Sequence, residues 1–221
     1  MVKPRIVETD EGIQGEFNVE IFNKMQRRFR DKGWIETDAI IKSGIDSGLA
    51  LEIGPGPGYL GLEWLKKTNG THLKGMEISP DMINIAKRNT KEYGLEDRAD
   101  YVNGDAQKMP FDDNMFDAVF TSGSLHEWSE PLKIFNEVSR ILKPNGRFFV
   151  SDLRRDMNVL MKSLMWLMTN PKEIRPGLIT SINASYTVAE ITDILKQSGL
   201  VNFEIKQNTM GFDIAGQKKS D

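Results

Sequence analysis

The 221-residue sequence contains no cysteine, and this absence excludes several kinds of chemistry at once. Disulfides, thiolate metal sites and cysteine nucleophiles all require a sulfhydryl group. No stretch approaches the roughly 20 apolar residues of a membrane-spanning helix, and the first residues lack the apolar segment of a signal peptide. We therefore expect a soluble, cytoplasmic protein without stable membrane insertion, and we find no motif that indicates a metal site.

An excess of positive charge is also missing. The chain carries 29 basic and 32 acidic side chains, for a net charge of -3. Nucleic-acid-binding domains generally present a basic surface, so we expect no DNA partner. There is no internal repeat and no low-complexity tract, and the length suits one domain covering residues 1–221.

Short apolar runs alternate with amphipathic ones from residue 48 onward. The apolar runs predict five buried strands, at 49–53, 72–77, 99–104, 116–122 and 147–152. The amphipathic runs predict the intervening helices, at 59–67, 79–93 and 130–142, and KPNG at 143–146 predicts a turn. This alternation indicates a parallel sheet with helices on both faces.

Two late strands, 202–207 and 211–217, are joined by only three residues and must therefore pair antiparallel. A capping box at Thr187 and Glu190 predicts the helix that precedes them, running to about residue 198. The predicted fold class is α/β: a Rossmann-like seven-stranded sheet of five parallel strands ending in an antiparallel hairpin.

Two further segments lie outside this alternation. Residues 1–47 hold predicted helices at 16–30 and 38–47 and are expected to form an N-terminal helical cap. Residues 153–185 are expected to form a helical insertion. Within the insertion, the methionine-rich face of 155–168 fits either a core helix packed on the sheet or a lid over an apolar ligand. Contact with a membrane surface is a third interpretation.

The stretch LEIGPGPG at 51–58 predicts a glycine-rich turn between a strand and a helix. Such turns let a dinucleotide or S-adenosylmethionine approach the backbone. Gly56, Gly58 and Gly61 satisfy the dinucleotide spacing, but the first glycine after the strand is Gly54. A pyrophosphate would also face the carboxylate of Glu52, whereas S-adenosylmethionine has no phosphate and offers a cationic end to that acid. We therefore expect Glu52, Gly54, Gly56 and Gly58 to bind this cofactor.

Four stretches, taken in order, resemble the motifs of the class I S-adenosylmethionine-dependent methyltransferases, in particular the quinone and sterol group. They are LEIGPGPG, GMEIS (75–79), NGDAQKMPF (103–111) and FDAVFTSGSLHEW (116–128), and the resemblance is strong over about residues 48–152. It implies binding of S-adenosyl-L-methionine and release of S-adenosyl-L-homocysteine.

The resemblance also assigns roles to individual residues. Glu77 would accept hydrogen bonds from both ribose hydroxyls, and Ile78 could lie against the adenine ring. Asp105 would bind the exocyclic amine of adenine, and the amide of Ala106 would contact the ring. The backbone at Thr121 would approach the methionine portion of the cofactor.

His126 is the only histidine near the predicted methyl group, because His72 lies at the far end of the second strand. It either orients or deprotonates the acceptor, or it only lines the cavity. Residues 121–124 read TSGS, which replaces the tetrapeptide of enzymes that methylate nucleic-acid amines. The sequence thus predicts methyl transfer to a small-molecule acceptor. The helical insertion at 153–185 is expected to cover the site of this acceptor. Methylation of a protein or tRNA, and binding of the cofactor without turnover, are the alternatives.

Overall fold

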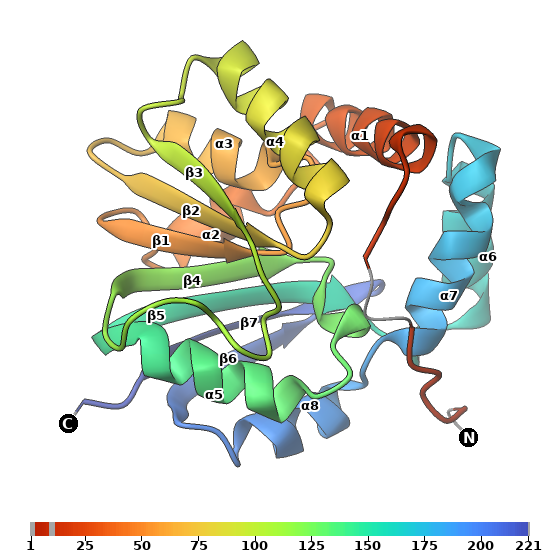
Figure 1. Cartoon of the computed structure of the whole chain (residues 1–221). Coiled ribbons are helices and arrows are strands. Elements are labelled where there is room, and N and C mark those ends of the chain that lie inside the picture. The colour runs from red at the N-terminus through yellow and green to blue at the C-terminus, as the bar shows by residue number, and fades with distance from the viewer. Residues whose placement is uncertain (1–2, 9–11, 221) are drawn as a thin grey trace.

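The computed structural model describes residues 3–8 and 12–220, and these residues form one seven-stranded sheet (Figure 1). The strand order is β3-β2-β1-β4-β5-β7-β6. Strands β1 to β5 are parallel, and β7 runs antiparallel to both of its neighbours, which confirms the predicted fold class. The strands are β1 Leu49–Ile53, β2 His72–Glu77, β3 Ala99–Asn103, β4 Phe116–Ser122, β5 Leu142–Leu153, β6 Leu200–Gln207 and β7 Gly211–Lys218.

Helices cover both faces of the sheet (Figure 1). One face carries α2 Thr37–Lys42, α3 Tyr59–Lys67 and α4 Pro80–Tyr93, with α1 Glu16–Asp31 packed on α3 and α4. The other face carries α5 Pro131–Ile141 and α8 Val188–Leu195. The remaining helical segments are η1 Leu125–Glu127, α6 Val159–Met168, η2 Lys172–Ile174 and α7 Arg175–Ala184.

Strand β1 shows why the central strands are largely apolar. Successive side chains of a strand point to opposite faces, and here both faces are covered. Leu51 packs into the core on the α5 side, while Ala50 packs into the core on the α3 side with Trp64 and Phe120. The carboxyl ends of β1, β2 and β4 meet at one edge, where parallel sheets of this type bind ligands.

The predicted helix boundaries of α4 and α8 rest on capping side chains that the structure contains. The Ser79 side chain accepts a hydrogen bond from the Met82 amide, and Pro80 occupies the first turn. Both hydrogen bonds of the capping box between Thr187 and Glu190 are present. Such caps satisfy amide groups that have no partner inside the helix.

The largest differences from the predicted boundaries are at the second helix and at the KPNG turn. The helix expected at 38–47 is shorter and ends at Lys42, because Gly44 adopts a left-handed φ of 87° and turns the chain. The KPNG turn lies inside β5: Leu142 pairs with Phe116, the next four residues bulge out, and pairing resumes at Arg147. The strand therefore begins before the turn and continues after it.

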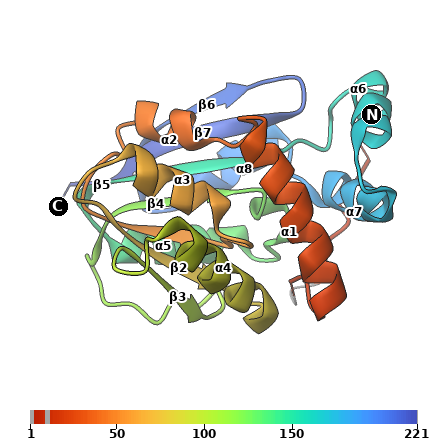
Figure 2. The ribbon, with the colours of Figure 1, turned by 90° about the horizontal axis from the view of Figure 1, so that it is seen from above.

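The insertion at 153–185 forms two helices, α6 and α7, which Figure 2 shows standing beyond the sheet. All of α6 lies in the described part of the chain, and none of its residues is buried. Val159 and Leu160 are 78% and 81% exposed. The interpretation of this helix as core is therefore wrong, and its role as a lid stays a prediction.

Among the described residues, no helix is both long enough and apolar enough to cross a bilayer.

Candidate active site

The glycine turn after β1 depends on backbone conformations that other residues rarely adopt. Gly54, Gly56 and Gly58 have φ values of 61°, 52° and 84°. A Cβ atom on Gly54 would lie 2.9 Å from that of Ser124, and one on Gly58 would lie 2.7 Å from the Tyr101 hydroxyl. No side chain forms an N-cap hydrogen bond at Gly58 in the described part of the chain, and the first-turn amides of α3 other than that of Gly61, which faces Glu52, suit a carboxylate ligand.

Glu77 lies directly beside this turn. Its Oε2 accepts a hydrogen bond from the Gly56 amide at 3.1 Å, and its Oε1 accepts one from the Ser79 amide at 3.0 Å. Burial raises the pKa of Glu77, and the backbone hydrogen bonds oppose that shift. The structure thus brings the turn and the predicted ribose ligand together, with the half-exposed Ile78 next in the chain.

Asp105 and Ala106 follow β3 at the same edge. The Gly104 amide donates to the Glu77 carbonyl at 3.1 Å, which ties the end of β3 to the end of β2. Asp105 is exposed and accepts a hydrogen bond from the Gln107 amide at 2.8 Å. Their contacts with adenine stay predictions.

Glu52 is placed differently from what the charge argument assumed. Its side chain points beneath α3, where a Cβ atom on Gly61 would lie 2.3 Å from Oε2. Burial raises the pKa of Glu52 to about 8, with a partly opposing contribution from the Gly61 amide and a further increase from Glu77. Because the neutral acid is then favoured at pH 7, Glu52 neither repels a pyrophosphate nor offers a full counter-charge. Its place in cofactor binding stays a prediction.

Thr121 joins β4 to β1 through its side chain. The Thr121 hydroxyl donates to the Ile53 carbonyl at 2.7 Å and also contacts the Ser124 hydroxyl. Only 1% of Thr121 is exposed, so the structure assigns its side chain to the scaffold. The predicted approach of the Thr121 backbone to the cofactor stays a prediction.

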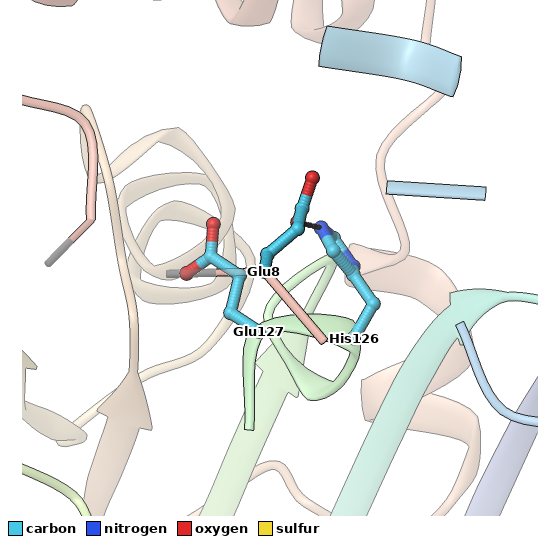
Figure 3. Close-up of side chains that lie close together, drawn as sticks. All are labelled: Glu8, His126 and Glu127. Atoms are coloured by element: carbon cyan, nitrogen blue, oxygen red, sulfur yellow. Dashed lines mark ion pairs between the residues drawn. The ribbon is translucent and has the colours of Figure 1, made fainter. Parts of the chain in front are cut away.

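His126 lies on η1, immediately after β4, and Asp152 holds it in place. Its Nδ1 is 2.9 Å from Oδ1 of Asp152, and its backbone amide donates to Oδ2 at 2.7 Å. The other ring nitrogen, Nε2, faces Glu8 at 3.6 Å (Figure 3). Burial lowers the pKa of His126, but the charge and hydrogen bond of Asp152 outweigh it, so that the pKa rises to about 9.

Glu127 is next to His126 in the chain, and Glu36 reaches the end of β4. Burial raises the pKa of Glu127 to about 7, although the charge of His126 opposes the shift. Glu36 accepts a hydrogen bond from the Ser122 hydroxyl at 2.9 Å, and burial raises its pKa as well. Arg154, in contrast, forms an ion pair with Asp156 at 2.7 Å.

An N-terminal strap, defined as residues 3–8 and 12–15, carries Glu8 to the site. Arg5 anchors it by donating to the carbonyls of Ala184, His126 and Trp128. Farther along, a Cβ atom on Gly12 would lie 2.8 Å from the Ile78 side chain. Sequence reasoning missed both Glu8 and Glu36, because neither belongs to a local motif and only the tertiary fold brings them here.

Comparison with known proteins identifies the central part of the chain. Residues 51–150 match the family model described as a methyltransferase domain. A demethylmenaquinone methyltransferase of Clavibacter sepedonicus is 30% identical over 155 residues, which is 65% of this chain. The match covers 62% of that relative, so it spans less than two thirds of its length.

Two solved structures share the fold over nearly the whole chain. A SAM-dependent methyltransferase from Aquifex aeolicus has a TM-score of 0.71 at 20% identity, with 93% of this chain and 100% of that one covered. The (4+2)-cyclase SpnF has a TM-score of 0.72 at 19% identity, with 99% and 100% covered. Because these identities are low, they speak for the fold alone. The glycine turn and the acid at the end of β2 both lie within residues 51–150, the part of the chain that matches the methyltransferase domain model.

Proposed function

We propose that this protein transfers the methyl group of S-adenosylmethionine to a small-molecule acceptor. The observation that carries the proposal is the convergence of the glycine turn, Glu77 and His126 at one edge of the sheet. The uncapped amides of α3 suit the cofactor carboxylate, and the buried carboxylate of Glu77 suits the ribose hydroxyls.

The proposed reaction is an in-line displacement at the methyl carbon. Bound S-adenosylmethionine would supply the methyl group, the acceptor would supply the electron pair that receives it, and S-adenosylhomocysteine would be left. Holding acceptor and methyl group in line is the main task of the protein. A proton lost by the acceptor needs a base, and the acidic side chains around His126 are the candidates for that role.

His126 then orients the acceptor, and the strap and helices α6 and α7 cover it. The acceptor class is drawn from the relative that acts on a quinone precursor, and the cytoplasm is the expected place of action. A function other than methyl transfer is the second candidate, because SpnF shares this fold and is named a cyclase.

Calorimetric titration with S-adenosylmethionine and with NAD tests the cofactor. We expect the first to bind and the second not to bind, and the reverse result would overturn the proposal. Release of S-adenosylhomocysteine with a panel of quinols, sterols and amines then tests turnover. Cofactor binding with no release for any acceptor, protein and tRNA included, would favour the non-catalytic alternative.

A further inference from the structure

We propose that Glu8, His126 and Glu127 form a binding site for one divalent transition-metal ion. One nitrogen or oxygen atom from each of these side chains can be chosen so that all three lie within 4.8 Å of one another. Figure 3 shows the three side chains gathered around one space above the end of β4. Nothing in the motifs of the cofactor site requires this grouping.

The spacing between His126 and Glu8 is the first observation that favours a metal ion. Their facing atoms, Nε2 and Oε2, are 3.6 Å apart, which is long for a hydrogen bond. Two ligands of one metal ion, each about 2.1 Å from it, are separated by roughly 3–4 Å. The observed distance therefore suits two atoms that share an ion better than it suits a direct contact.

The hydrogen bonds between Asp152 and His126 are the second observation that favours a metal ion. Asp152 binds Nδ1 and the backbone amide of His126, so the ring is fixed with Nε2 turned toward the two glutamates. Metal-binding histidines commonly donate their second ring nitrogen to a carboxylate in this way, which fixes the tautomer. The side chain of His126 is only 8% exposed, and Nε2 makes no hydrogen bond to any residue in the described part of the chain.

The negative charge around the site is the third observation that favours a metal ion. Glu8, Glu127 and Asp152 surround one imidazole, and no described lysine or arginine forms an ion pair with any of them. The nearby Arg5 donates to backbone carbonyls instead. A divalent cation bound at Nε2 would balance the charge of the two ligand carboxylates.

The donor set indicates the class of metal. One imidazole and two carboxylates suit zinc, iron(II) or manganese(II), whereas magnesium and calcium prefer oxygen ligands alone. Three protein ligands leave a coordination position open. The site adjoins the cofactor turn, because Ser124 both precedes His126 on the chain and limits the space at Gly54. An acceptor bound through oxygen could thus meet the cofactor there.

The test is calorimetric titration of the chelator-treated full chain with zinc or manganese chloride, without cofactor or acceptor. We expect one ion per chain, with magnesium bound more weakly. His126→Ala should weaken binding by more than about 100-fold, and the positioning variant Asp152→Asn by about 10–100-fold. His72→Ala removes the only other histidine and serves as the matched control with unchanged binding.

A second measurement needs no variant at the site. In nitrogen-labelled wild-type protein, zinc should shift the ring signals of one histidine, which His72→Ala identifies as His126. The proposal is overturned if no saturable binding occurs, if magnesium binds best, or if the ring of His72 is the one that shifts. It is also overturned if Glu8→Gln weakens S-adenosylmethionine binding but not metal binding. Since no cofactor is present in the titration, its failure leaves the proposed methyl transfer intact.

Discussion

The cofactor side and the acceptor side of the candidate site are built in different ways. On the cofactor side, the turn at 54–58 follows β1, and Glu77 ends the adjacent strand β2. The Gly56 amide donates to the Glu77 carboxylate, and the Gly54 amide donates to the Met76 carbonyl. On the acceptor side, Glu8, Glu36 and His126 come from three distant parts of the chain. The first side is specified locally by a rigid scaffold, and the second depends on the covering segments, where specificity can vary without altering the scaffold.

The rigidity of the cofactor side can be broken most strongly at Gly58. Gly58→Ala combines a left-handed φ of 84° with a clash at the Tyr101 hydroxyl, and we expect it to lower the free energy of unfolding by about 3 kcal/mol. Gly70→Ala has a similar φ of 65° but no atom within 4 Å of the new Cβ, and should cost only about 1 kcal/mol. Denaturant unfolding measures both.

The clash itself is tested by adding Tyr101→Phe to Gly58→Ala. Removing the hydroxyl that lies nearest the new Cβ should restore part of the lost stability. Equal losses for Gly58→Ala and Gly70→Ala would show that close packing at the turn is unimportant.

The buried acid of the cofactor side predicts a dependence on pH. The pKa of Glu52 is about 8 in the folded protein against an ordinary 4.5, so the folded chain keeps a proton that the unfolded chain releases. The contribution of Glu52 to the free energy of unfolding therefore falls as the pH rises from 4.5 through 8. Glu52→Gln should be roughly 2–4 kcal/mol more stable than wild type at pH 8, with little difference near pH 4.

Denaturant unfolding across this pH range checks the prediction. The exposed control Glu96→Gln should leave the pH profile of the wild type unchanged. If Glu52→Gln also follows the wild-type profile, the buried carboxyl is ionised in the folded protein and the prediction fails.

A substitution of Glu77 should change the affinity for the cofactor more than it changes the free energy of unfolding. Glu77→Gln keeps the shape of the side chain but places an amide where the carboxylate accepts hydrogen bonds. We expect S-adenosylmethionine to bind about 10–100-fold more weakly in a calorimetric titration. Unchanged affinity would remove Glu77 from the ribose site, and Glu96→Gln again provides the control.

The smallest effect on stability is expected on the acceptor side. Leu160→Ser and Leu167→Ser on α6 replace side chains that are 81% and 66% exposed, and should change the free energy of unfolding by less than about 0.5 kcal/mol. In contrast, Leu65→Ala in the core should cost about 2–5 kcal/mol. If either α6 variant lost more than about 1 kcal/mol of the free energy of unfolding, the proposed difference between the rigid cofactor side and the covering segments would be contradicted. Slower methyl transfer at unchanged stability would support a lid.

The parts of the molecule that sequence reasoning predicted are those with local causes. The five parallel strands follow from apolar runs, and the starts of α4 and α8 follow from capping residues that lie within three positions of their partners. Glu77 was found because it ends a strand next to the strand that carries the glycine turn.

The parts that could not be predicted have long-range causes. The apolar face of α6 has the same pattern whether it packs on the sheet or faces solvent, and only tertiary packing decides between them. Glu8 reaches His126 across 118 positions, and no local pattern marks it. The raised pKa of Glu52 could not be predicted because it depends on burial, which the sequence does not give directly.

The strap also has a consequence for how the protein is made. Arg5 hydrogen-bonds to Ala184, which leaves the ribosome 179 residues later. Strands β1 to β4 can pair as they emerge, but the set of strap anchors at His126, Trp128 and Ala184 is complete only after α7 has been synthesised. The cofactor edge can therefore form early during translation, whereas the covering of the acceptor side is among the last steps of folding.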